Sequence, residues 1–200
     1  MNGPMHPAPI GTCSLRDRLL DAAESMTGAG GSANLTLDAV AAAAGVSKGG
    51  LLYHFPSKDA LLAAMIDRHV DRIEERCVQL RATLPGSMDC AELKAWVLSV
   101  LQPDPATRDT GAGLFAAAAN NPALLDCVRK RYADRVAQMA GSSGNFALAA
   151  SIMLAVDGLV LAEIWRMSPF SDGQRAAIVD QLLRLADQAF GPGVAPEKQE

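Results

Sequence analysis

The 200-residue sequence predicts an all-α protein of about nine helices. Half of its residues are hydrophobic and only 4% are aromatic, while alanine is abundant and β-branched residues are sparse. Such a composition can fill a helical core and disfavours strands. Apolar residues also recur at helical spacing along successive segments, and glycines, prolines and capping residues separate these segments.

The first two expected helices lie near the N-terminus. One begins after the N-cap Ser14 and ends at the glycine-rich segment 28–31. The next is capped by Thr36 and broken by Gly45. Residues 1–13 contain several prolines, and we expect them to form a disordered arm.

Serine caps also start the third and fourth helices. The third begins at Ser47 and ends at Pro56, and the fourth begins at Ser57 and runs to Pro85. The outer face of the fourth helix is predicted to be a solvated mixed-charge stripe formed by Asp67, Arg68, Asp71, Arg72, Glu74, Glu75 and Arg76. Further helices are expected at 88–101, 105–119, 122–140, 145–168 and 172–190, followed by a disordered tail at 191–200.

The charge total gives the chain no general attraction for nucleic acid. The formal net charge is −4, and residues 1–60 carry four basic side chains against five acidic ones. Any affinity for DNA must therefore come from where the charges lie rather than from their sum.

The four cysteines, Cys13, Cys77, Cys90 and Cys127, contain no CxxC pair and no histidine at metal-ligand spacing. This pattern suits a reducing cytosol, and we expect no metal and no other cofactor. Basic neighbours of Cys77 and Cys127 leave open a redox switch, and the alternative is that these thiols are simply buried.

No basic segment followed by an apolar one is found near the N-terminus, so a signal peptide is not expected. The longest apolar run, 146–162, is interrupted by Asp157 and is short for a membrane span, which predicts a buried helix and no membrane partner. The sequence contains no HExxH, no Walker-type loop and no paired nucleophile and base, and we therefore expect that the protein is not an enzyme. A small-molecule carrier is the rival interpretation.

Residues 36–54 have the local pattern of a helix-turn-helix. Ala41 is small enough for a second helix to cross closely, and Gly45 can supply the left-handed turn. Val46 and Leu51 would bury the angle between the two helices. In this motif the second helix enters the DNA major groove, although a plain α-hairpin would also favour glycine at its turn.

The segments "RLLDAAESM" and "TLDAVAAAAGVSKGGLLYHFPSKDALL" resemble the DNA-binding domain of the TetR (tetracycline-repressor-like) family of bacterial regulators. The resemblance covers residues 15–62, where turn, second helix and "HFPSK" match in register. Residues 113–125, "GLFAAAANNPALL", are similar to a segment in the regulatory half of some members. The resemblance implies a helix-turn-helix DNA-binding domain of three helices at 14–60 and a ligand-binding and dimerisation domain at 61–190.

The same resemblance implies eight DNA contacts. Thr36, His54 and Lys58 are expected at phosphates, and Phe55 is expected to anchor the second helix in the core. The groove-facing residues are Ser47, Lys48, Gly49, Gly50 and Tyr53. Hydroxyls, lysines and the amides of helix N-termini are the groups that fix proteins on a duplex. Taken alone, His54 has a structural role as its alternative and Lys58 has simple solvation.

One position departs from the family pattern. Leu52 stands where the family usually has tyrosine, and leucine cannot make that residue's phosphate contact. Either Tyr53 or Lys48 would then make the contact, or the affinity for DNA would be lower. Few side chains remain for direct base readout, which predicts help from DNA shape.

The resemblance further implies a homodimer formed by the helices at 145–168 and 172–190. A palindromic operator requires two recognition helices about 34–36 Å apart, which a two-fold dimer supplies. The small residues of the first of these helices would permit close helix approach, and burial within one subunit is the alternative.

The effector, expected to be largely apolar, would contact large or polar residues of the C-terminal half. The candidates are Trp96, Phe115, Met139, Met153, Asp157, Trp165 and Met167, each of which can also be a core residue. Asp157, within the most apolar helix, could meet a cationic or hydroxylated ligand or hydrogen-bond at the dimer interface. Its third alternative is an ion pair with Arg129, Arg131 or Arg135.

Together these inferences predict a ligand-responsive transcriptional regulator and, among the kinds of regulator, a repressor. It would bind a palindromic double-stranded operator as a homodimer and be released by a small molecule, through the effector's differential affinity for two dimer states. Its expected location is the bacterial cytoplasm, on the nucleoid when bound to DNA.

Overall fold

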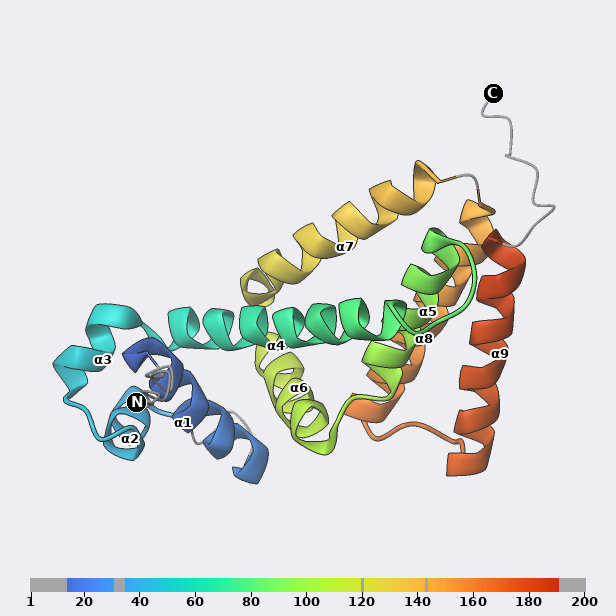
Figure 1. Ribbon diagram of the computed structural model, residues 1–200. Helices are drawn as coiled ribbons and strands as arrows, with labels where there is room; N and C mark the ends of the chain where they lie inside the picture. Colours follow the sequence, from blue (N-terminus) through green and yellow to red (C-terminus); the bar gives the residue numbers. More distant parts are fainter. Residues whose placement is uncertain (1–13, 31–34, 120, 143, 191–200) are drawn as a thin grey trace, which may run out of the picture.

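Figure 1 shows the computed structural model of the protein, which describes residues 14–30, 35–119, 121–142 and 144–190. Within these ranges the chain forms α-helices and one short 3-10 helix, and the described residues contain no strand. The all-α prediction is confirmed. The expected arm and tail, and Cys13 with them, lie outside the described residues.

The elements follow one another closely along the chain. In order they are α1 (Leu15–Gly30), α2 (Leu37–Ala43), α3 (Lys48–His54), α4 (Lys58–Arg81), α5 (Met88–Leu101), α6 (Pro105–Ala118), η2 (Pro122–Leu125), α7 (Asp126–Ala140), α8 (Phe146–Ile164) and α9 (Asp172–Phe190). Helix α4 connects the two ends of the molecule, with α1 to α3 at its beginning and α5, α8 and α9 at its end (Figure 1).

The predicted caps begin the N-terminal helices. Backbone amides three residues further on donate to the side-chain oxygens of Ser14, Thr36, Ser47 and Ser57 at 3.0–3.2 Å. Each cap satisfies an amide that has no partner within its own helix. Gly45 has a φ of +68°, and Val46 N–H donates to Ala41 O at 2.9 Å, which ends α2 with a tight turn.

Helix α1 ends at Gly30, within the glycine-rich segment 28–31 where the sequence places its end. Two later segments differ from the sequence predictions. The segment 122–140 is divided into η2 and α7. Helix α8 ends at Ile164, where Arg166 takes a φ of +53° and Met167 N–H donates to Ala162 O at 2.8 Å. This end has the bonding of a glycine-type cap with arginine in the left-handed position.

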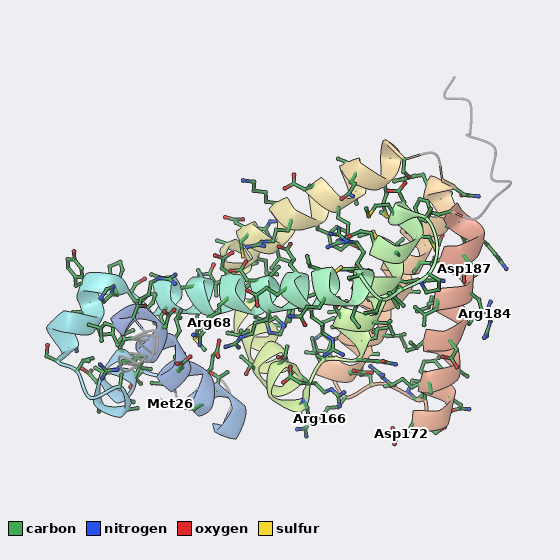
Figure 2. All side chains as sticks on the ribbon, viewed as in Figure 1. Met26, Arg68, Arg166, Asp172, Arg184 and Asp187 are labelled. Atoms are coloured by element: carbon green, nitrogen blue, oxygen red, sulfur yellow. The ribbon has the colours of Figure 1, made fainter. Side chains whose placement is uncertain are left out.

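The predicted solvated stripe on α4 is wrong. Arg68 lies between α4 and α1 (Figure 2) and pairs there with Asp21 at 2.8 Å and Glu24 at 2.7 Å. On the other side of α4, Arg131 of α7 pairs with Asp67 at 3.0 Å and also with Asp71 and Glu74. The sequence spacing of charged residues is the same on a helix face in solvent and on a face that packs against two other helices, so spacing alone could not separate the two cases.

Two hydrophobic clusters form the core, and α4 contributes to both. The first joins α1, α2, α3 and the start of α4 to Leu114 and Ala118 of α6 and Leu124 of η2. The second joins Cys77 near the end of α4 to α5, the end of α7, α8 and α9. The N-terminal helices therefore share apolar packing with α6, a helix of the C-terminal half.

Candidate DNA-binding surface and effector cavity

Helices α2 and α3 have the geometry that the sequence predicts for a helix-turn-helix. Val40, Ala41, Leu51 and Phe55 are all buried, with 3% or less of each residue exposed. The cap of Ser47 and the left-handed Gly45 fix the direction in which α3 leaves the turn. A short helix held on a rigid apolar base can present its outer face to a groove.

The outer face of α3 carries an exposed aromatic side chain. Tyr53 is 86% exposed, and its predecessor Leu52 is 37% exposed. At the start of the helix, Lys48 Nζ lies 3.0 Å from an oxygen of Asp38 on α2, with both side chains largely in solvent. A Cβ at Gly49 or Gly50 would approach nothing closer than 3.5 Å. Because the two glycines have no side chains, the backbone of this part of the helix lies directly at the surface.

Aromatic contacts join α3 to its surroundings. The rings of Tyr53 and His54 meet edge to face with centroids 5.2 Å apart, and His54 in turn lies beside the buried ring of Phe55. The guanidinium of Arg16 stands 5.5 Å over the Phe55 ring. All eight predicted DNA-contact residues thus lie on α3, at the N-terminus of α2 or at the N-terminus of α4. Helix α3 stands at the end of the molecule opposite α8 and α9 (Figure 1).

A cavity of about 430 Å³ lies between helices α4 to α8. Its lining is mostly apolar with several charged groups, and it consists of His69, Val70, Ile73, Glu74, Trp96, Ser99, Val100, Pro103, Thr107, Arg108, Gly111, Ala112, Phe115, Val128, Arg131, Tyr132, Arg135, Asp157, Val160, Glu163, Ile164 and Arg166. A concave site whose surface is largely apolar is typical of small-molecule binding.

The structure divides the predicted effector contacts into two groups. Trp96, Phe115 and Asp157 line the cavity. The other four do not: Met139 and Met153 belong to the second hydrophobic cluster, while Trp165 and Met167 are 60% and 63% exposed near the end of α8. Helical spacing places these side chains on a helix but does not say which neighbour the helix presents them to.

Asp157 has a partner that sequence reasoning missed. The hydroxyl of Tyr132 donates to Asp157 Oδ2 at 2.6 Å. Burial raises the pKa of the Asp157 carboxyl, and the hydrogen bond from Tyr132 partly offsets this effect. Tyr132 lies 25 residues earlier on another helix, and only the packing of α7 on α8 brings the two together.

The arginine alternative for Asp157 is not what the structure shows. Arg129 pairs with Asp126, and Arg131 with the acids of α4. Arg135 lies 3.4 Å from Glu92 and stacks over the ring of Trp96. His69 is another lining residue that sequence reasoning missed, and it is only 6% exposed.

A second, more polar cavity of about 650 Å³ lies between α1, α4 and the segment from Ser99 to Thr110. Ile73, Ser99, Pro103 and Thr107 line both cavities. These four side chains therefore lie between the two cavities.

The described cysteines have the character of unreactive thiols. Burial is the main effect on each: it raises the pKa of Cys77 to about 11 and also raises the pKa of Cys90 and Cys127. A thiol with a raised pKa forms little of the reactive thiolate at neutral pH. This result favours the burial interpretation over the redox switch for these three residues. Within the described ranges, no group of three or more His, Cys, Asp or Glu side chains could hold a metal ion.

Helix α8 leaves an apolar face uncovered. It is long and apolar enough to cross a membrane by length and composition, yet only 22% of its most apolar window is buried within the subunit. Leu154 is 69% exposed, and Phe146 and Leu161 are 38% and 41% exposed. A soluble monomer rarely exposes such a face unless something binds there.

The structure thus combines an exposed helix-turn-helix at one end with a helical domain that contains a cavity at the other. The model described as "Bacterial regulatory proteins, tetR family" matches residues 19–65, and that described as "Tetracyclin repressor-like, C-terminal domain" matches residues 91–187. The two matches cover most of the chain, and the protein belongs to the TetR family of DNA-binding transcriptional regulators, which are not enzymes.

Solved structures share the fold along most of the chain. A transcriptional regulator from Rhodococcus sp. RHA1 is 24% identical, with 88% of this chain and 97% of that chain covered and a TM-score of 0.69. A TetR-family member from Streptomyces coelicolor is 24% identical, with 84% of this chain and 98% of that chain covered and a TM-score of 0.60. The multidrug binding protein EbrR complexed with ethidium is also 24% identical, with 84% of this chain and 98% of that chain covered and a TM-score of 0.59. No curated protein sequence matches the chain.

Proposed function

We propose that the protein is a homodimeric repressor that binds a palindromic operator through α3 and is released when a small molecule enters the cavity between α4 and α8. The observation that carries the proposal is the outer face of α3, where Tyr53 is 86% exposed on a helix whose base is fully packed. Within the subunit its ring meets only the edge of His54, and most of its surface is left open to a partner.

The proposed DNA contacts divide into readout and positioning groups. Tyr53 and Lys48 face the groove, and the absence of side chains at Gly49 and Gly50 lets the backbone approach the bases. His54 and Lys58, with Thr36 and Ser47 at helix N-termini, bind phosphates. The pairing of Lys48 with Asp38 holds the ammonium group at the start of α3 without burying it.

The proposed dimer forms through α8 and α9. The exposed apolar residues Phe146, Leu154 and Leu161 lie along α8, and Gly158 has nothing within 4 Å of where its Cβ would stand. A second copy packed on this face would bury it and allow close helix approach. Two-fold symmetry then supplies the second α3 that a palindromic site needs.

The proposed effector site is the 430 Å³ cavity. Its walls come from α4 and α6, which both also pack on α1, so a ligand that prefers one arrangement of these helices changes the position of the DNA-binding end. EbrR, which shares the fold, is described as a multidrug binding protein and holds ethidium, which supports a small-molecule site in this architecture. The cytoplasm of a bacterium is the expected location.

The test is selection of bound sequences from random duplex DNA, followed by mobility shift on the best site. We expect a palindromic sequence and a complex of two chains. In Lys58→Ala, affinity should fall on all sequences alike, and the slope of log affinity against log salt should decrease by about one unit per protomer. Lys130→Ala, which removes an exposed lysine from α7, is the control. No shift at low salt would contradict the proposal and favour a carrier.

A further inference from the structure

Asp157 is the carboxylate of the cavity between α4 and α8 that lacks a cationic partner among the described residues. Glu74 and Glu163 line the same cavity, but Glu74 pairs with Arg131 and Glu163 pairs with Arg175. Asp157 receives only the Tyr132 hydroxyl, on Oδ2, and no donor in the described part of the chain reaches Oδ1.

None of the four arginines that line the cavity pairs with Asp157, although Arg135 stacks over Trp96 in the cavity wall. Arg131 and Arg135 are engaged by acids of α4 and α5. Arg108 and Arg166 also line the cavity but are exposed, and Figure 2 shows Arg166 at the lower end of the molecule. Their charges are screened by water and salt, so they do not compensate a carboxylate within the cavity.

The surroundings of Asp157 favour one kind of ligand. Phe115 and Tyr132 provide aromatic walls, whose electron-rich faces attract cations, while one face of Trp96 already carries the guanidinium of Arg135. A partly buried carboxylate loses hydration that only a cation or a hydrogen-bond donor can replace. The raised pKa of Asp157 reflects this uncompensated burial, because no positively charged side chain contributes to it.

We propose that the effector is an organic cation with an aromatic or apolar body, bound by the carboxylate of Asp157. The proposal rests on the proposed function of the cavity as the effector site. The body of the ligand lies against Trp96 and Phe115, and its positive group faces Oδ1, the oxygen that Tyr132 leaves free.

The experiment uses two probes of nearly the same size and shape and of opposite charge, tetraphenylphosphonium and tetraphenylborate. The chain has two tryptophans, so Trp165→Phe leaves Trp96, in the cavity wall, as the only one. Fluorescence titration of this full-length protein then reports binding at the cavity. We expect the phosphonium to bind at least about tenfold more tightly than the borate.

Asp157→Asn keeps an oxygen that can accept the Tyr132 hydroxyl and removes the charge. It should weaken phosphonium binding by at least about tenfold. Asp134→Asn, the same change at an exposed position of α7, should leave binding unchanged. The comparison of the two probes needs no change at Asp157, so it remains decisive if Asp157→Asn folds poorly.

The outcomes separate the two proposals. If the borate binds as tightly as the phosphonium, or if Asp157→Asn binds the phosphonium normally, the cation assignment is overturned while the effector cavity stands. If neither probe changes the fluorescence of Trp96, the cation assignment is overturned. The effector cavity is then tested separately, by whether any other small molecule releases the protein from its operator in the mobility-shift assay.

Discussion

Gly111 of α6 lies against the imidazole of His69 on α4. A Cβ at position 111 would stand 2.8 Å from His69 Cε1 and 2.9 Å from Nε2, closer than side chains pack. Two positions further along α6, a Cβ at Gly113 would stand 2.6 Å from Thr27 Cγ2 of α1. The two glycines therefore allow α6 to pack closely on α4, which lines the cavity, and on α1, the first helix of the DNA-binding end.

The first prediction concerns this contact. Gly111→Ala should lower the free energy of unfolding by about 1–3 kcal/mol, because the buried ring of His69 must move to admit a methyl group. Chemical denaturation measures the change. Gly173→Ala, where nothing lies within 4 Å of the added Cβ, should change stability by less than about 1 kcal/mol. The double variant His69→Ala, Gly111→Ala should be less destabilised than the sum of the single changes, and simple additivity would contradict the contact.

The second prediction is a pH dependence of stability that arises at His69. Burial lowers the pKa of His69 below its usual 6.5, repulsion by Arg72 lowers it further, and Glu24 and Asp104 oppose the shift. The unfolded chain then binds the proton more readily than the folded one. The contribution of His69 to the free energy of unfolding is fully present above about pH 6.5, and it is lost as the pH falls through the folded-state pKa. Urea unfolding from about pH 7.5 to pH 5 should show a flatter profile for His69→Gln, and equal slopes would refute the assignment.

A third prediction separates recognition from folding at Tyr53. Because this side chain is 86% exposed, Tyr53→Ala should leave thermal stability almost unchanged. Its affinity for the selected operator should fall by at least about tenfold if the ring contacts DNA. Val78, exposed on α4 outside the proposed DNA surface, provides the control as Val78→Ala. Normal mobility shift by Tyr53→Ala would exclude the residue from the interface.

The fourth prediction tests the dimer surface. Leu154→Glu places a charge on the exposed face of α8, where it costs the monomer little but cannot be buried between two copies. Light scattering coupled to gel filtration should change from a two-chain to a one-chain mass. Val78→Glu, the same substitution at an exposed apolar residue of α4, should keep the two-chain mass. A dimeric Leu154→Glu protein would place the interface elsewhere.

The fifth prediction concerns the thiols. With the pKa of Cys77 raised to about 11, its alkylation by iodoacetamide near pH 8 should be at least about a hundredfold slower than in the unfolded chain. Mass spectrometry of the peptides resolves each cysteine, and the protein unfolded in guanidinium is the reference. Rapid labelling of Cys77 in the folded protein would revive the redox-switch interpretation.

How far the sequence predicts this molecule differs between its two ends. The helix-turn-helix depends on local groups, since the caps at Thr36 and Ser47 and the turn at Gly45 act within a few residues. Such interactions join residues that are close together in the sequence, so the sequence can predict them, and these three predictions are confirmed. The DNA contacts of the eight residues stay predictions, although the structure gathers all of them at one end.

The cavity depends on which helices meet, and sequence spacing does not determine this. Trp96, Met139 and Met153 all occur at helical spacing and all belong to the second hydrophobic cluster, yet only Trp96 also lines the cavity. Of the arginines expected near Asp157, Arg131 and Arg135 pair instead with acids of α4 and α5, and Arg129 pairs with Asp126 of its own helix.

By itself, then, the sequence determined the all-α class, the caps and turn of the DNA-binding helices and the acidic residue inside an apolar helix. The tertiary structure alone decided that Tyr132 reaches Asp157, that Arg68 joins α4 to α1 and that His69 requires glycine at position 111. The physical reason is range. Backbone capping acts over about one helical turn, whereas these contacts join residues on different helices whose mutual orientation is set by the packing of the whole core.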